Sequence, residues 1–469
     1  MEQLSGLDAT FVHNESARTP MHISPLMIYQ QPANKKKAVR FKDILGTFER
    51  NLHKSAIFRR KLVQVPMKMD QPYWVEDKNF DLEFHVRHIA LPKPGDWRQF
   101  CILLARLHAR GLDMSRPLWE AYVIEGLDNV EGLPKGAFAI LMKVHHSAID
   151  GVSAAGIINA LHSLDPVADS IRVDDSWEGE PEPGKFDLLT RAYMNNIRKP
   201  LEMTSAIANI VPAFSRLKKL KEELGGEDGN VSIGTRFNGR VSNHRVVDGI
   251  AMEFQKIRAI KNAVAGATIN DVIVSIVGGG LRRYLTAHDE LPDTSLTAAA
   301  PISVRSDSDS NSKGNQISVM TISLGTDIAD PVERLTAVHS GATRSKAYSS
   351  AMGASTMTDV AQSMPARMMA LGLKAVSAAT MLDNLAVPVH TVVSNVPGPQ
   401  VPIYMSGARV HTLMGLGPLL DGVGLFHAVI SNSDNISIMA ASCREMMPDP
   451  EFYAQCLQES FDELRDAVL

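Results

Sequence analysis

Cysteine is scarce in this chain, with only Cys101, Cys443 and Cys456 among 469 residues. The three lie far apart in the sequence and are odd in number. This pattern indicates neither a disulfide framework nor a zinc site built from paired cysteines. We therefore expect a protein of a reducing compartment.

Long apolar runs are also missing. The longest, such as those at 137–142 and 272–277, fall far short of the roughly 20 residues that a membrane-spanning helix needs. The N-terminal segment MEQLSGLDAT has acidic and polar residues where an export signal would have a basic stretch and an apolar run. We expect a cytoplasmic protein that contacts a membrane or lipid inclusion only peripherally, if at all.

A strong net charge is absent too. The formal net charge is −4 at pH 7, with 45% hydrophobic and 21% charged residues, which is an ordinary globular composition. Binding to nucleic acid phosphates usually requires a strongly basic face. Nucleic acid is therefore not an expected partner.

The length predicts more than one domain, because a single hydrophobic core stops growing well below 469 residues. Prolines, glycines and charged runs interrupt the pattern between about residues 165 and 240, and we place the connection between domains there. The predicted division is an N-terminal domain over 1–185, a linker over 186–240 and a C-terminal domain over 241–469.

The linker contains an apolar stripe at helical spacing, formed by Met203, Ile207, Ile210, Phe214 and Leu217. A basic cluster follows it, formed by Lys218, Lys219 and Lys221. The pattern predicts an amphipathic helix that either packs on a domain or lies on a membrane surface.

Apolar periodicity predicts an α/β fold for both halves. In the first half we expect strands at 118–124 and 136–144, with helices at 100–111 and after Gly151. In the second half the expected strands are 246–254, 390–394 and 436–442, and the expected helices are 256–263 and 271–285. Asp449 and Pro450 make a good start for a last helix, whose predicted core residues are Phe452, Cys456, Phe461 and Leu464.

The segment HHSAIDG at 145–151 is the densest group of polar residues with chemical potential. A histidine with a pKa near ~6.5 is mostly neutral at pH 7, so it can accept a proton from an attacking hydroxyl and return it to a leaving group. His145 and His146 are both candidates. Asp150 could fix the local backbone or pair with an arginine, and Gly151 would permit a tight turn.

Other interpretations of this segment stay open at this point. A histidine in apolar surroundings is often a hydrogen-bonded core residue. His145, His146 and Asp150 could bind a metal, although adjacent histidines tend to point apart and the sequence lacks an obvious third clustered ligand. The chain has no G-x-S-x-G segment, no P-loop and no dinucleotide-binding glycine pattern, which argues against those classes of site.

HHSAIDG resembles the HHxxxDG signature of the chloramphenicol-acetyltransferase-like superfamily, which includes condensation domains of peptide synthetases. Further segments resemble the bacterial wax ester synthase/diacylglycerol acyltransferases, and the likeness runs nearly from end to end. These segments are LSGLDATF at 4–11, PMH at 20–22, PLWE at 117–120, TINDVIVSIVGGGLRRYL at 268–285, PISVRS at 301–306, GNQ at 314–316 and SNVPGP at 394–399.

The resemblance implies two chloramphenicol-acetyltransferase-like domains, each a mixed sheet with helices, joined by a crossover linker around a central channel. It implies that His146 is the catalytic base and His145 a supporting residue. The substrates would be acyl-CoA and a long-chain alcohol or diacylglycerol, giving a wax ester or a triacylglycerol. No metal and no cofactor would be required, since acyl-CoA is a substrate.

The resemblance also matches the family's paired Asn-Asp to Asn270 and Asp271, and Asn270 is a candidate for a polar group facing the channel. The same segment is equally typical of a helix N-terminus, where Thr, Asn and Asp cap the first amides. For Asp150 we favour a structural ion pair, with Arg305 as the proposed partner. SNVPGP and GNQ are either rigid turns or parts of the channel wall.

Two alternative functions stay open. An acyltransferase of the condensation-domain type would use the same base and take its acyl group from a carrier protein. A non-catalytic acyl-binding protein of lipid droplets would have kept only the fold. The PLWE and Asn-Asp segments argue against the first alternative, and the intact HHxxxDG motif argues against the second.

Overall fold

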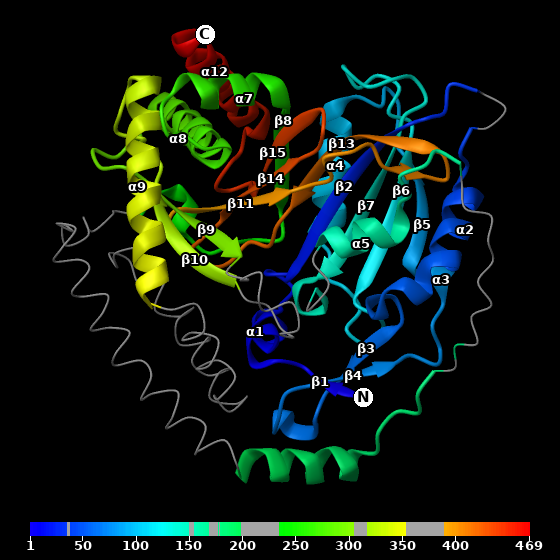
Figure 1. Cartoon of the computed structure of the whole chain (residues 1–469). Helices are drawn as coiled ribbons and strands as arrows, with labels where there is room; N and C mark the ends of the chain where they lie inside the picture. The colour runs from blue at the N-terminus through cyan, green and yellow to red at the C-terminus, as the bar shows by residue number, and fades with distance from the viewer. Residues whose placement is uncertain are drawn as a thin grey trace.

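The computed structural model describes residues 1–34, 38–149, 154–167, 177, 179–197, 234–303, 317–352 and 389–469. Five predictions from the sequence lie outside these residues: Asp150, Gly151, Arg305, the GNQ segment at 314–316 and the amphipathic helix of the linker. The described chain forms an α/β fold with two six-stranded mixed sheets and one three-stranded sheet (Figure 1).

The first six-stranded sheet has the order β12-β13-β2-β7-β6-β5. Its strands are β2 (His22–Gln30), β5 (Val86–Ala90), β6 (Trp119–Glu125), β7 (Phe138–His145), β12 (Tyr404–Met405) and β13 (Ala408–Leu416). All neighbours are antiparallel except β5 and β6. Strand β7 lies near the middle and every one of its residues is buried, which explains the apolar run over 138–142.

Helices cover both faces of this sheet. Helix α4 (Trp97–His108) packs on one face, where Phe100 and Leu104 join Leu141 of β7 in one apolar core. Helix α2 (Phe41–Asn51) and helix α5 (Ala154–Leu161) belong to the other core, which contains Ile140 of β7. Leu141 and Ile140 point to opposite faces because side chains alternate along a strand.

Strand β13 comes from the C-terminal half of the sequence but belongs to this first sheet. It pairs antiparallel with β2 over Arg409 to Leu416. The predicted domain boundaries at 185 and 240 stay a prediction, with the addition that the range 241–469 contributes β12 and β13 to the N-terminal sheet. The two halves are therefore joined through backbone hydrogen bonds as well as through side chains.

The second six-stranded sheet has the order β10-β9-β11-β14-β15-β8. Its strands are β8 (Arg245–Glu253), β9 (Thr297–Ser303), β10 (Ile317–Ser323), β11 (Thr391–Pro397), β14 (Leu425–Ser431) and β15 (Asn435–Cys443). The longer helices of this half are α7 (Phe254–Ala263), α8 (Ile269–Ala287), α9 (Pro331–Met352) and α12 (Pro450–Val468). They lie together on one side of the sheet (Figure 1).

The remaining elements are short or lie at the N-terminal end. They are β1 (Glu2–Gln3), α1 (Gly6–Asn14), β3 (Arg60–Val63), β4 (Tyr73–Glu76) and α3 (Leu82–His85), with 3-10 turns at Leu52–Lys54, Ala56–Phe58, Pro66–Lys68, His146–Ala148 and Arg236–Asn238. Strands β1, β4 and β3 make the small sheet. Residues 185–197 are helical, and all but the first of them lie in the predicted linker. Among the described residues, no helix combines the length and the apolar character needed to cross a membrane.

The strands and helices expected from periodicity are present, with ends shifted by a few residues. The last helix begins at Pro450, as expected, and Cys456, Phe461 and Leu464 are buried in it, while Phe452 is half-buried. The sequence patterns missed β2, β9, β10, β13 and β14 as strands, as well as the shorter strands β1, β3, β4, β5 and β12. Of these, β2 and β14 lie inside the six-stranded sheets, and β10 lies at an edge.

Candidate active site

The histidine pair lies where strand β7 ends and a single 3-10 turn begins. His145 is the last residue of β7, and its backbone N–H donates to the Leu118 carbonyl at 3.0 Å. His146 opens the turn, and its backbone N–H donates to the Met21 carbonyl at 2.8 Å. Two neighbouring segments thus fix the pair by its backbone, and the strand ends between the two histidines.

His145 is buried and held by its own turn. Its Nδ1 accepts the Ser147 backbone N–H at 3.2 Å and lies 2.7 Å from the Ser147 Oγ, which donates to it. Because Nδ1 accepts these hydrogen bonds, the ring N–H is on Nε2, which faces the Glu15 carboxylate at 3.5 Å. This arrangement orients the ring, and both the ring and its Nε2 are buried, so His145 has the geometry of a supporting residue.

His146 is half-buried and stacks on Phe11, with ring centroids 3.9 Å apart and an angle of 16° between the planes. Burial, with a smaller effect from the charge of His145, lowers the pKa of His146 to about 4. The ring is therefore neutral at pH 7. Its Nδ1 is fully buried without a hydrogen-bond partner among the described residues.

Behind the pair lies a buried group that links both halves of the chain. The Nε2 of His22 donates to the His108 carbonyl at 3.0 Å, and the Nε2 of His108 donates to the Gly417 carbonyl at 3.0 Å. The Nδ1 of His108 then accepts from Ser24 Oγ at 2.8 Å. Burial lowers the pKa of His22 well below its ordinary value and that of His108 to about 3. Both rings are structural, neutral hydrogen-bonding groups.

Asn270 and Asp271 lie at the start of helix α8, and they differ in environment. Asp271 forms a capping box with Thr268, since each side chain accepts the backbone N–H of the other, and its carboxylate also meets His339 Nδ1 at 2.9 Å. Asn270 is half-buried, and its Oδ1 accepts from Asn395 Nδ2 at 3.3 Å. The structure thus brings the Asn-Asp segment to the SNVPGP segment, and it gives Asp271 a capping role.

A family model described as the wax ester synthase/diacylglycerol acyltransferase catalytic domain matches residues 4–273, which is more than half of the chain. A second model, the C-terminal domain of the same proteins, matches residues 313–465. The chain belongs to the wax ester synthase/diacylglycerol acyltransferase family.

Known proteins of this family align over the whole length. A putative diacylglycerol O-acyltransferase of Mycobacterium tuberculosis is 31% identical over 487 aligned positions, covering 100% of both chains. Another from the same species is 29% identical, over 99% of this chain and 90% of its own. The structure of a wax ester synthase/diacylglycerol acyltransferase from Marinobacter aquaeolei has a TM-score of 0.68 and 26% identity, with 99% of each chain covered.

More distant structures share the fold alone. A trichothecene 15-O-acetyltransferase from Fusarium sporotrichioides has a TM-score of 0.59 at 11% identity, over 98% of this chain and 95% of its own. A condensation domain of the calcium-dependent antibiotic synthetase has the same TM-score and identity, over 100% and 96%. The family assignment and this shared fold confirm the predicted two-domain α/β architecture.

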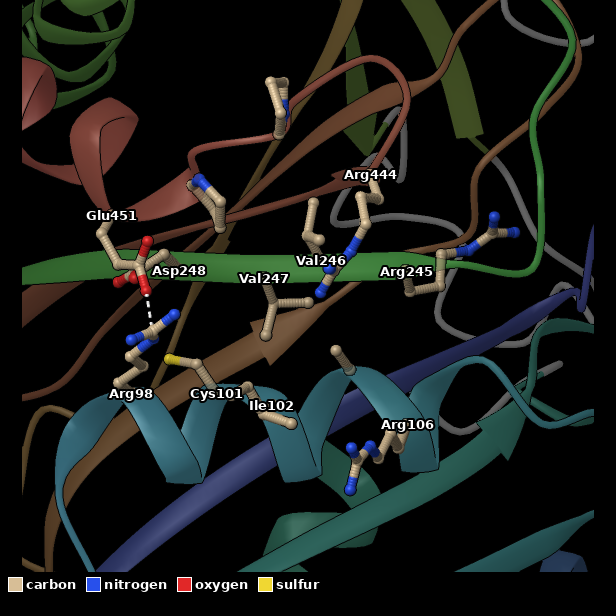
Figure 2. Close-up of a pocket in the computed structure, with 13 residues that line it drawn as sticks. Arg98, Cys101, Ile102, Arg106, Arg245, Val246, Val247, Asp248, Arg444 and Glu451 are labelled. Atoms are coloured by element: carbon tan, nitrogen blue, oxygen red, sulfur yellow. Dashed lines mark ion pairs between the residues drawn. The ribbon is translucent and has the colours of Figure 1, made fainter.

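A cavity of about 240 Å³ lies between helix α4 and strand β8 (Figure 2). It is lined by Arg98, Arg106, Arg245 and Arg444 together with Asp248 and Glu451, and Arg98 pairs with Glu451 at 2.8 Å. The histidine pair does not line it. In the part of the chain that the structure describes, no group of three or more His, Cys, Asp or Glu side chains could hold a metal ion.

The structure adds site residues that the sequence patterns did not single out. Phe11, Glu15 and Met21 contact the histidine pair directly, and His108 lies behind it. The sequence did contain a signal for two of them. Phe11 is the last residue of the family segment LSGLDATF, and Met21 belongs to the family segment PMH. No local pattern marks Glu15 or His108, whose contacts join residues far apart in the sequence.

Proposed function

We propose that this member of the family transfers a long-chain acyl group from acyl-CoA to the hydroxyl of a fatty alcohol or a diacylglycerol, with His146 as the general base. Relatives aligned over the whole chain carry the name diacylglycerol O-acyltransferase. The single observation that carries the assignment of the base is the position of His146, whose half-buried ring opens the turn at the end of β7 and stacks on Phe11. Because its Nδ1 is fully buried, Nε2 is the nitrogen that we assign to proton transfer, and burial lowers the pKa of the ring to about 4.

The proposed reaction needs one base and no enzyme-bound acyl group. As the hydroxyl oxygen attacks the thioester carbonyl carbon, His146 Nε2 takes the hydroxyl proton and a tetrahedral oxyanion forms. The oxyanion collapses, the carbon–sulfur bond breaks, and His146 returns the proton to the leaving thiolate. The products are the ester and free coenzyme A. A donor that stabilises the oxyanion contributes ~3 kcal/mol in comparable enzymes.

The roles of the other motif residues are part of the proposal. His145 orients the turn that carries His146, and Asp150 and Gly151 support the motif. Asp150 forms a structural ion pair with Arg305, and Asn270 faces the channel. No metal and no cofactor takes part, because proton transfer by one imidazole accounts for every step.

The decisive experiment offers the purified protein palmitoyl-CoA with hexadecanol or with dipalmitoylglycerol, with no carrier protein present. We expect ester and free thiol in equal amounts, insensitive to EDTA, and no product from His146→Gln. If the wild-type protein makes no ester from acyl-CoA but does so from an acylated carrier protein, the condensation-type alternative holds. If it makes no ester from either donor but binds palmitoyl-CoA, the non-catalytic alternative holds.

We also propose that the enzyme meets its lipid substrates at a membrane or lipid-inclusion surface through the helix at 185–197 (Figure 1). One face of this helix packs against the body through Leu188 and Ala192, which join Val65 and Tyr73 in a small core. The opposite face exposes four large apolar side chains: Phe186, Tyr193, Met194 and Ile197. Such a contiguous exposed face is typical of contact with another apolar surface.

A flotation assay with phosphatidylcholine–diacylglycerol liposomes tests this surface. We expect the wild-type protein to float with the vesicles and Phe186→Ser/Ile197→Ser to stay in the soluble fraction. Turnover of a short, water-soluble acyl donor and alcohol should be equal in both proteins. Equal flotation of the two proteins would contradict the assignment of this face.

A further inference from the structure

The loop between α1 and β2, residues 15–21, holds the histidine pair from the N-terminal side. Glu15 at its start faces His145 Nε2 and also accepts the Met21 backbone N–H at 2.5 Å. Met21 at its end accepts the backbone N–H of His146. Both ends of the loop therefore contact the pair, and the Glu15 carboxylate ties the two ends together.

The loop is internally stiff. Ser16 Oγ accepts the Thr19 backbone N–H at 3.2 Å, and the Ser16 N–H donates to the Thr19 carbonyl at 3.3 Å. Thr19 Oγ1 also donates to the Asn14 carbonyl at 2.9 Å. These hydrogen bonds restrain the shape of the turn. A displacement of its middle therefore also moves its two ends.

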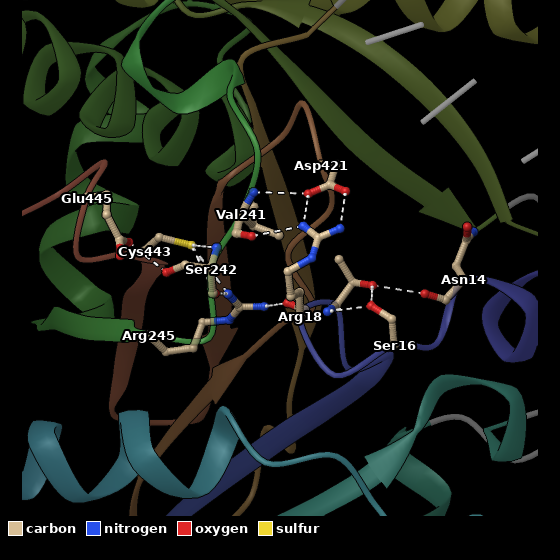
Figure 3. A network of polar contacts seen from close by, with 10 residues as sticks. Asn14, Ser16, Arg18, Val241, Ser242, Arg245, Asp421, Cys443 and Glu445 are labelled. Carbon is tan, nitrogen blue, oxygen red and sulfur yellow. Dashed lines mark hydrogen bonds and ion pairs between the residues drawn. The ribbon is translucent and has the colours of Figure 1, made fainter. Parts of the chain in front are cut away.

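Arg18, in the middle of the loop, is held by the C-terminal half (Figure 3). Its Nη1 and Nη2 donate to the two carboxylate oxygens of Asp421 at 2.9 and 3.2 Å, and Nη1 also donates to the Val241 carbonyl at 3.1 Å. Arg245 Nη2 donates to the Arg18 carbonyl at 2.5 Å. Side chain and backbone of Arg18 are thus both fixed by residues more than 220 positions away.

The pairing with Asp421 is stronger than an ordinary surface contact. The Asp421 side chain is only 8% exposed, and its Oδ1 also accepts the Val241 backbone N–H at 3.0 Å. Two-pronged bonds between a guanidinium and a carboxylate fix orientation as well as distance. Removing the guanidinium takes the ion pair and both of its hydrogen bonds from a nearly buried carboxylate, which is costly.

We propose that Arg18 is a positioning residue for the acyl-transfer reaction, which ties the loop that holds the histidine pair to the C-terminal half through Asp421, Val241 and Arg245. This inference rests on the proposed function. Proton transfer needs Nε2 of His146 within hydrogen-bond reach of the hydroxyl, and a misplacement of about 1 Å can cost about 10²-fold in rate. We call the contacts of Arg18 with Asp421, Val241 and Arg245 the clamp. The clamp fixes the position in which the N-terminal half holds His146 next to a substrate that both halves enclose.

The kinetic test compares Arg18→Gln, Arg18→Lys and Asp421→Asn with Arg283→Gln. Arg283 is a matched control, because its guanidinium also bridges to carboxylates, Glu459 and Glu463, at similar exposure but within the C-terminal half. We expect Arg18→Gln and Asp421→Asn to lower kcat by about 10–100-fold with KM for palmitoyl-CoA unchanged within about twofold. Arg18→Lys keeps the positive charge but cannot make two parallel hydrogen bonds to the Asp421 carboxylate, so it should recover part of kcat. Arg283→Gln should have the kcat of the wild type.

A second readout does not depend on turnover. The pKa of His146 is followed by NMR of protein labelled in its histidine rings, with the signal assigned from the spectrum of His146→Gln. Without the contacts of Arg18 the loop can move and water can reach the ring of His146. The pKa of His146 should therefore rise toward 6.5 in Arg18→Gln and stay low in Arg283→Gln.

The outcomes separate the two proposals. If the wild-type protein makes no ester from any acyl-CoA, the proposed function is wrong. The NMR titration alone then tests whether Arg18 positions His146. Wild-type kcat together with an unchanged titration in Arg18→Gln overturns the positioning role. So does a loss of kcat that merely follows the fraction of folded protein, measured by urea unfolding, with the titration of the folded molecules unchanged.

Discussion

The ring of Phe11 lies face to face with the ring of His146, at a centroid distance of 3.9 Å. Phe11 is on helix α1, and His146 is on the turn after β7, so the contact joins two segments that the chain separates by 135 positions. The aromatic ring displaces water from one face of the imidazole. Desolvation of this kind disfavours the charged form and is the main cause of the lowered pKa of His146.

The pH dependence of the reaction should report this environment. The pKa of His146 is lowered to about 4, so its neutral, active form persists as the pH falls and is lost only around pH 4. We expect kcat/KM for palmitoyl-CoA to be level from pH 8 to about 5 and to fall tenfold per pH unit below about 4. Circular dichroism at each pH checks that the protein stays folded. A fall of kcat/KM with its midpoint near pH 6.5 would contradict the desolvated environment of His146.

Replacing Phe11 should raise the pH at which kcat/KM falls on the acidic side. In Phe11→Leu the flat ring is lost and water gains access to the imidazole, so the pKa of His146 should rise and the acidic fall of kcat/KM should begin at higher pH. Phe41→Leu is the matched control, because Phe41 stacks on the exposed His88 at 4.8 Å on an outer part of the N-terminal half. The control should keep the wild-type profile. A Phe11→Leu profile identical to the wild type would show that the stack does not set the pKa.

The two histidines should respond differently to substitution. His146→Ala removes the proposed base from a half-buried site, so we expect a rate loss of at least about 10²–10³-fold with little change in urea unfolding. His145→Ala leaves the buried Ser147 N–H and hydroxyl without their acceptor, which should cost about 1–3 kcal/mol of stability and lower activity less than His146→Ala does. Stability unchanged in His145→Ala would contradict its structural role.

The histidine pair and its local setting could be predicted from sequence, because both follow from short-range patterns. The apolar run before His145 becomes a buried strand, and the turn follows at the histidines. Asp271 lies three residues after Thr268 and caps the helix, as the spacing indicates. These features depend on hydrogen bonds between near neighbours, which a linear pattern records.

The contacts that orient the pair could not be predicted in this way. Glu15 reaches His145 across 130 positions, and Arg18 reaches Asp421 across 403. These contacts exist because β2 lies between β7 and β13, which brings the C-terminal half beside the N-terminal loop. A single sequence carries no signal for that pairing of strands, since antiparallel neighbours share only a general apolar alternation.

The glycine run of helix α8 gives a last prediction about stability. A Cβ built on Gly278 would lie 1.9 Å from the backbone carbonyl oxygen of Leu324, so Gly278→Ala forces backbone to move and should destabilise the protein by about 3 kcal/mol. Gly46, in the middle of α2, is the matched control. Its Cβ would meet only the flexible end of Arg50 at 3.1 Å, so Gly46→Ala should be neutral or stabilising by about 0.5–1 kcal/mol. Urea unfolding of both variants measures the difference, and equal stabilities would show that the close approach of α8 to Leu324 does not require glycine.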